Sequence, residues 1–168
     1  TVQSGNEKLE LKNLLLGEVW VCSGQSNMEW RMDMLPATYP DELKTARNDD
    51  IRFMVVEKTL ATAPKADVTV QRKWAAVDPS TVGNCSAVAY FYAKQLQKEL
   101  KVPVGLIVTA WGGTPAQSWT SFEGLHEFPN YSKNFIENIH PIKLEDMSRK
   151  IQEGRDAFVR SLKEKAEY

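Results

Sequence analysis

An apolar stretch that runs directly into a glycine-serine turn constrains this chain more than any other feature. Val19-Trp20-Val21-Cys22-Ser23 is typical of a central strand in a parallel sheet, and Gly24-Gln25-Ser26-Asn27-Met28 follows it at once. Ser26 is therefore expected at the carboxyl edge of the sheet, where open α/β folds place their sites. Such a turn exposes the Oγ of a nucleophile and directs backbone N–H groups at an oxyanion. The alternative is that Ser26 only caps a helix.

Two further apolar runs and one clear helix predict an α/β architecture. Residues 51–56 and 104–110 are typical of buried strands. Between them, apolar residues recur every three or four positions over residues 86–100, which predicts a helix capped by Asn84 or Ser86. Strand, helix and strand in this order favour a parallel sheet.

A second glycine turn, Trp111-Gly112-Gly113-Thr114, follows the strand predicted to end at residue 110. In a doubly wound sheet, this turn and the one that carries Ser26 face the same edge. Ser26 and the amides of Gly112 and Gly113 are therefore expected within reach of one pocket.

The remaining segments are less regular. Residues 8–16 alternate loosely between polar and apolar, which predicts a strand, and residues 40–47 predict a short helix. Residues 59–71 are polar and are expected to be extended. Residues 146–168 predict a charged, amphipathic helix.

Composition excludes several classes of partner. The formal net charge is −1 over 168 residues, which gives no electrostatic footprint for nucleic acid or an anionic membrane. No apolar run is long enough to span a bilayer. Cys22 and Cys85 are expected to be buried free thiols, although sequence leaves a disulfide open. Neither lies in a C-x-x-C pair, so nothing indicates a metal, and acyl transfer through serine needs no cofactor.

Four blocks of sequence resemble one family of enzymes. They read LGEVWVCSGQSNMEW at residues 16–30, IRF at 51–53, SAVAYFYA at 86–93 followed by VPVGLI at 102–107, and WGGTPAQSW at 111–119. Over roughly residues 14–121 the chain resembles the sialate O-acetylesterase family of carbohydrate esterases, within the SGNH (GDSL-like) hydrolase superfamily. This resemblance implies a three-layer α/β/α sandwich with a parallel, flavodoxin-like sheet, incomplete in this chain.

The resemblance also implies a mechanism. Ser26 would attack an acetyl ester on a sugar and form an acetyl-enzyme that water hydrolyses. The amide of Ser26 and the turn at Gly112 and Gly113 would hold the oxyanion. Nearby polar side chains are candidates for substrate contacts, with turn or surface roles as the alternative: Gln25, Asn27, Arg31 and Gln117.

The late blocks of the family pattern are missing. A Gln-Gly-Glu block is absent, and the late Asp-x-x-His or Asp-x-His-Pro segment is echoed only by Glu137-Asn138-Ile139-His140-Pro141, with Asn in place of the acid. His140 is the candidate base, with a surface loop histidine as the alternative, and His126 is a weaker candidate.

Three predicted strands also fall short of the roughly five that the family domain has, and a sheet that stops there leaves an apolar edge unpaired. Residues 1–16 are therefore expected to be the tail of a preceding β-rich region. Residues 17–168 are expected to be the N-terminal part of the hydrolase domain, with a helical insertion from about residue 122 to 168. The C-terminal remainder of the domain, on the same or a separate polypeptide, would be the partner.

Three functions remain open. The first is a carbohydrate O-acetylesterase, similar to sialate 9-O-acetylesterases, acting on acetylated sugars. The second is an acetylxylan or other short-chain esterase. The third is a non-catalytic carbohydrate-binding protein in which Trp30, Trp111 and Trp119 stack on sugars, although core packing is the commoner fate of tryptophan. The resemblance alone favours a periplasmic, secreted or lysosomal location, and the residues themselves leave the location open.

Overall fold

The computed structural model describes residues 2–61, 65–130, 133 and 144–166. It divides into two compact units. The first consists of Thr1–Lys58 and Asp67–Thr114, and the second of Thr59–Ala66 and Pro115–Tyr168. Each unit is described by itself. None of the helices in the described ranges is both long and apolar enough to span a membrane.

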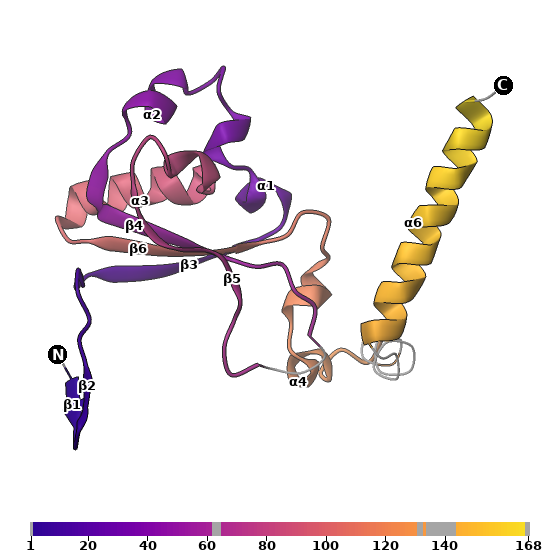
Figure 1. Cartoon of the computed structure of the whole chain (residues 1–168), viewed down its shortest axis with the longest axis horizontal. Helices are drawn as coiled ribbons and strands as arrows, with labels where there is room; N and C mark the ends of the chain where they lie inside the picture. The colour runs from indigo at the N-terminus through magenta and orange to yellow at the C-terminus, as the bar shows by residue number, and fades with distance from the viewer. Residues whose placement is uncertain (1, 62–64, 131–132, 134–143, 167–168) are drawn as a thin grey trace. The chain divides into compact units, whose positions relative to one another are not determined.

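The first unit is built on a four-stranded sheet of order β3-β6-β4-β5. The strands are β3 (Glu18–Gly24), β6 (Val104–Ala110), β4 (Asn48–Val56) and β5 (Val70–Val77). The first three are parallel, as their apolar runs predicted, and β5 is antiparallel to β4 (Figure 1). The α/β class is confirmed, and the sheet is mixed because of β5.

The core lies between this sheet and helix α3 (Ala87–Leu100), as Figure 1 shows. Phe53 of β4 and Leu106 of β6 are opposite each other in the register and are fully buried beneath the helix. The helix presents Ala89 and Ala93, both buried, and these small side chains allow it to lie close to the strands. The predicted cap is confirmed at Ser86, whose Oγ accepts a hydrogen bond of 3.3 Å from the amide of Ala89.

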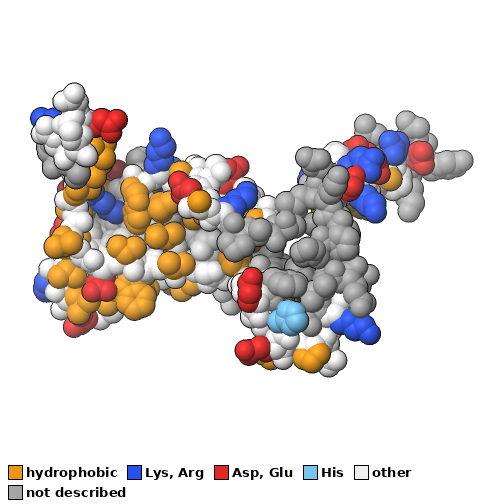
Figure 2. Space-filling model, turned by 90° about the horizontal axis from the view of Figure 1, so that it is seen from below, with side chains coloured by type: hydrophobic (Ala, Val, Ile, Leu, Met, Phe, Trp, Pro, Cys, Tyr) orange, Lys and Arg blue, Asp and Glu red, His pale blue; other side chains and the backbone are white. Residues whose placement is uncertain are grey.

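The opposite face of the sheet is open in the described residues. Val19 and Val21 of β3 are 62% and 65% exposed there, and Trp74 of β5 is 47% exposed. The Trp74 ring lies over Gly105, where a Cβ would be 3.3 Å from it. Figure 2 shows hydrophobic side chains gathered over this face. The first unit by itself therefore supplies two of the three expected layers.

The other elements are short, apart from one long helix in the second unit. They are β1 (Val2–Ser4), β2 (Glu7–Leu9), α1 (Ser26–Glu29), η1 (Met32–Met34), α2 (Pro40–Thr45), η2 (Val82–Asn84), η3 (Ala116–Trp119), α4 (Phe122–Leu125) and α6 (Leu144–Ala166). The expected helices over residues 40–47 and 146–168 correspond to α2 and α6.

Three expectations need correction. Residues 8–16 do not form one strand: a hairpin of β1 and β2 ends at Leu9, and the segment beyond it is held by Arg52, which donates to the backbone and side chain of Asn13 at 2.6 and 2.7 Å. The strand at residues 19–23 lies at the edge of the sheet rather than in its centre. The polar segment that ends at residue 71 runs into β5, an edge strand that apolar content did not predict.

Gly17 generates a prediction about stability. The chain enters β3 here against the backbone of Pro103, whose carbonyl accepts the Glu18 amide at 2.9 Å. A Cβ on Gly17 would lie 2.0 Å from that carbonyl oxygen, which is backbone and cannot move aside. We expect Gly17→Ala to destabilise the protein by about 2 kcal/mol or more in denaturant unfolding.

The matched control is Gly154→Ala in α6, where a Cβ meets nothing within 4 Å. Because alanine favours a helix more than glycine does, this change should be neutral or stabilising. Equal effects of the two substitutions would contradict the predicted close approach at Gly17.

Candidate active site

Ser26 lies at the carboxyl edge of the sheet, on a sharp turn from strand to helix. β3 ends at Gly24, whose φ of +149° favours glycine, and α1 begins at Ser26. The turn is closed by hydrogen bonds from Glu29 N–H to Gln25 O at 2.9 Å and from Trp30 N–H to Ser26 O at 3.0 Å. The N-cap is Gln25, so the Ser26 hydroxyl is not used to cap the helix, and the side chain is exposed.

The second glycine turn lies beside the first. Trp111 N–H donates to Gly24 O at 2.9 Å, which joins the ends of β6 and β3. A Cβ on Gly112 would be 3.3 Å from Ser26 Oγ and 3.6 Å from Ser26 Cα. Gly113 follows with a φ of +80° and open space around its Cα. The structure thus brings Ser26 and Gly112 together, as the topology of a parallel sheet requires.

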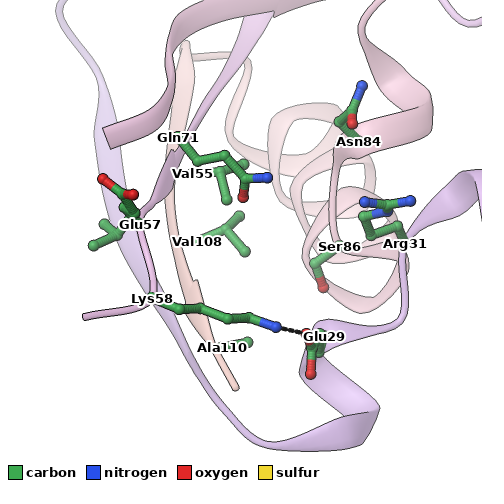
Figure 3. Close-up of a pocket in the computed structure, with 11 residues that line it drawn as sticks. Glu29, Arg31, Val55, Glu57, Lys58, Gln71, Asn84, Ser86, Val108 and Ala110 are labelled. Atoms are coloured by element: carbon green, nitrogen blue, oxygen red, sulfur yellow. Dashed lines mark hydrogen bonds and ion pairs between the residues drawn. The ribbon is translucent and has the colours of Figure 1, made fainter. Parts of the chain in front are cut away.

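Glu29 connects the two turns. One of its carboxylate oxygens, Oε2, accepts the amide of Gly112, and the other, Oε1, pairs with the Lys58 ammonium (Figure 3). Lys58 Nζ also lies 5.9 Å from the centroid of the Trp111 ring. The hydrogen bond from Lys58 and, to a smaller extent, that from Gly112 hold the pKa of Glu29 below its ordinary value, although burial opposes them. Glu29 is therefore charged at neutral pH and a poor base.

Sequence reasoning missed both members of this ion pair. A local signal existed for Glu29, because it lies three residues after Ser26 on the same short helix, inside the first resemblance block. None existed for Lys58, which follows β4 and reaches the site only because that strand ends beside β6.

The other candidate site residues differ in their location and in their contacts. Gln25 and Asn27 flank Ser26 and are exposed. Arg31 is held by Asp33 in a bidentate pair, with N···O distances of 3.0 and 2.9 Å. Gln117 lies in η3 and His126 follows α4, and both belong to the second unit. His140 lies outside the described residues.

A pocket of about 360 Å³ lies at the carboxyl ends of β4 and β6 (Figure 3). Its apolar lining comes from Val55, Val56, Val108 and Ala110, and its polar wall from Gln71, Asn84 and Ser86. The charged residues that line it, two of each sign, are Glu29, Glu57, Arg31 and Lys58. Arg31 is paired with Asp33 and Lys58 with Glu29, so most of these charges are compensated, and the polar side chains of the lining can form hydrogen bonds to a polar ligand.

The cysteines take no part in the site. Cys22 and Cys85 are free and buried, as expected. Burial raises the pKa of Cys22 and raises that of Cys85 to about 12, so both remain protonated and unreactive at neutral pH. The described residues contain no cluster of His, Cys, Asp and Glu that could hold a metal ion.

Comparison with known proteins decides the family. A family model described as "carbohydrate esterase, sialic acid-specific acetylesterase" matches residues 16–147. The chain belongs to this family.

Two curated relatives and one solved structure agree with this family. The chain is 32% identical over 131 residues to the sialate O-acetylesterase of Pongo abelii and 31% identical to that of Homo sapiens, covering 74% of this chain and 25% of each relative. The crystal structure of a carbohydrate acetylesterase from Xanthomonas citri superposes with a TM-score of 0.62 at 32% identity, covering 68% of this chain and 26% of that one. The chain thus spans about a quarter of the length of these family members.

The lowered pKa of Glu29 generates a prediction about acid stability. A carboxyl whose pKa is lower in the folded state stabilises the fold above its unfolded pKa, and this stabilisation is lost as the pH falls through the folded pKa. Glu29→Gln should therefore lower the free energy of unfolding at neutral pH by up to about 1 kcal/mol, since the pair is partly exposed.

The difference between Glu29→Gln and wild type should disappear when denaturant unfolding is repeated at a pH below the folded pKa. Glu7→Gln on the exposed strand β2 is the control and should show no comparable difference. A Glu29→Gln difference that stays constant with pH would mean that the carboxylate charge does not stabilise the fold.

Proposed function

We propose that this chain is the nucleophile-bearing part of a carbohydrate O-acetylesterase, with Ser26 as the nucleophile. The observation that carries the proposal is the position of Ser26: exposed, on a strand-to-helix turn, with its Oγ against a second glycine turn. Membership of the sialic acid-specific acetylesterase family supports the same reaction class.

In the proposed reaction, Ser26 Oγ attacks the carbonyl carbon of the acetyl ester while a base accepts its proton. The carbonyl π electrons move to oxygen and form a tetrahedral oxyanion. Its collapse re-forms the carbonyl and breaks the bond to the sugar oxygen, which takes the proton from the protonated base. Water then attacks the acetyl-serine in the same way and releases acetate.

The oxyanion needs N–H donors that are not already used. The Ser26 amide begins α1, and the Gly113 amide has no acceptor in the part of the chain that the structure describes. The Gly112 amide, by contrast, donates to Glu29. We therefore assign oxyanion stabilisation to Ser26 and Gly113, with Gly112 as the link that holds their turns together.

The base is proposed to come from the remainder of the hydrolase domain, on the same or a separate polypeptide. Glu29 is unsuited because both of its oxygens are occupied, and the late histidine segment of the family pattern is only echoed in this chain. The outer edge of β3 pairs with no strand among the described residues, and its exposed Val19 and Val21 offer a surface on which that remainder would pack.

The substrate class is proposed to be an acetylated sugar. The relatives are named as sialate O-acetylesterases and a carbohydrate acetylesterase, and the pocket beside Glu29 is lined by polar side chains that can form hydrogen bonds to the hydroxyls of a sugar. Rates of acetate release from 9-O-acetylated sialic acid and from acetylated xylan would separate the first substrate from its alternative.

Ser26→Ala should abolish acetate release by the complete hydrolase, because no other described hydroxyl occupies this position. It should also abolish covalent labelling by a serine-directed fluorophosphonate, detected by peptide mass spectrometry. Ser23→Ala, at an exposed serine of β3 just before the turn, is the control and should retain both.

Retained activity in Ser26→Ala would overturn the assignment of the nucleophile. Sugar binding by the wild-type protein without acetate release or labelling would instead favour the carbohydrate-binding alternative.

A further inference from the structure

A fixed negative charge lies close to the proposed reaction centre. The point where a Cβ would stand on Gly112 is 2.6 Å from Glu29 Oε2 and 3.3 Å from Ser26 Oγ. The two oxygens are therefore no further apart than these two distances together. The carboxylate is held there by the Gly112 amide and by its own place on α1, one turn after Ser26.

Such a charge opposes ester attack. The tetrahedral intermediate places a second negative charge on the substrate oxygen beside Ser26, and two like charges at this separation repel strongly where water is partly excluded. Glu29 is useful as the link between the two turns, yet an unpaired carboxylate at this position would raise the energy of the transition state.

Lys58 is placed to remove this conflict. Its ammonium pairs with Glu29 Oε1, whereas the bond to Gly112 uses the other carboxylate oxygen. The other cation of the pocket, Arg31, is already engaged by both oxygens of Asp33, and Glu57 adds a further negative charge to the lining. Lys58 is therefore the cation in the described lining that neutralises Glu29 directly.

We propose that Lys58 is a positioning residue for ester hydrolysis. It neutralises the Glu29 carboxylate, so that Glu29 can hold the Gly112 turn against Ser26 without opposing the oxyanion. This inference rests on the proposed function, because it requires Ser26 to be the nucleophile.

The test is a double-mutant cycle in the complete hydrolase, with acetate release and fluorophosphonate labelling of Ser26 as readouts. Lys58→Met leaves Glu29 charged and unpaired, and we expect kcat and the labelling rate to fall about 10- to 100-fold with KM little changed. Lys58→Arg keeps the charge and should retain most of the activity.

The double variant Glu29→Gln with Lys58→Met is the decisive member of the cycle. It removes both charges, while the side-chain oxygen of the introduced glutamine still accepts the Gly112 amide, so kcat should recover to within a few-fold of wild type. A purely structural role for Lys58 predicts no recovery. Lys58 is 42% exposed in its side chain, so these variants are expected to fold, and circular dichroism would verify it.

The pH profile provides a second signature. Without Lys58, the pKa of Glu29 loses the largest of the contributions that lower it, and Arg31 and the Gly112 amide remain as its favourable neighbours. The ratio of Lys58→Met to wild-type activity should therefore rise as the pH falls and Glu29 becomes protonated.

Ser26→Ala in the same series separates the two proposals. If Ser26→Ala is inactive and Lys58→Met has wild-type kcat, the inference about Lys58 is wrong and the nucleophile stands. Loss of activity in Lys58→Met that the double variant does not restore would also overturn the inference. If Ser26→Ala is active, the proposed function itself fails.

Discussion

The parallel pairing of β3 with β6 is the constraint on which the site depends. In its register Gly24 is opposite Ala110, so the two chains leave the sheet at the same level. Ser26 and Gly112 each follow two residues later, and the hydrogen bond from Trp111 N–H to Gly24 O fixes this exit. A slip of one residue would move the serine away from the glycine turn and also turn the apolar set of β3 to the wrong face of the sheet.

The turn that carries Ser26 follows an edge strand of this sheet. Cys22 of β3 is buried against the core and Trp20 contacts Tyr92 of α3 with ring centroids 5.2 Å apart, whereas Val19 and Val21 are exposed on the other face. An edge strand with one covered face has more freedom than a central one. If the remainder of a hydrolase domain packs on β3, as proposed above, it would also make the position of Ser26 more rigid.

Local sequence patterns predicted most of the fold. The errors concern features that depend on contacts between segments far apart in the sequence. The runs at residues 51–56 and 104–110 and the helix at 86–100 carry their own periodicity, and all three were found. β5 was missed because Arg72 and Lys73 interrupt its apolar residues, and it is held by pairing with β4 rather than by its own pattern. Strand order has no local signal at all, which is why β3 was expected in the centre. Lys58 was missed for the same reason: it is 29 residues from Glu29 in the sequence, and no local pattern indicates that the two meet.

The requirement for glycine at position 112 follows from the same geometry. A Cβ there would meet Glu29 Oε2 at 2.6 Å and Ser26 Oγ at 3.3 Å, so it would disturb the carboxylate link and press against the Ser26 side chain. The resemblance implied that this glycine turn helps to hold an oxyanion. The structure adds that the backbone at this position is approached first by a residue of the protein itself. Gly112 and Glu29 therefore depend on each other: the carboxylate reaches the amide only because no Cβ intervenes, and the turn stays against Ser26 because the carboxylate holds it.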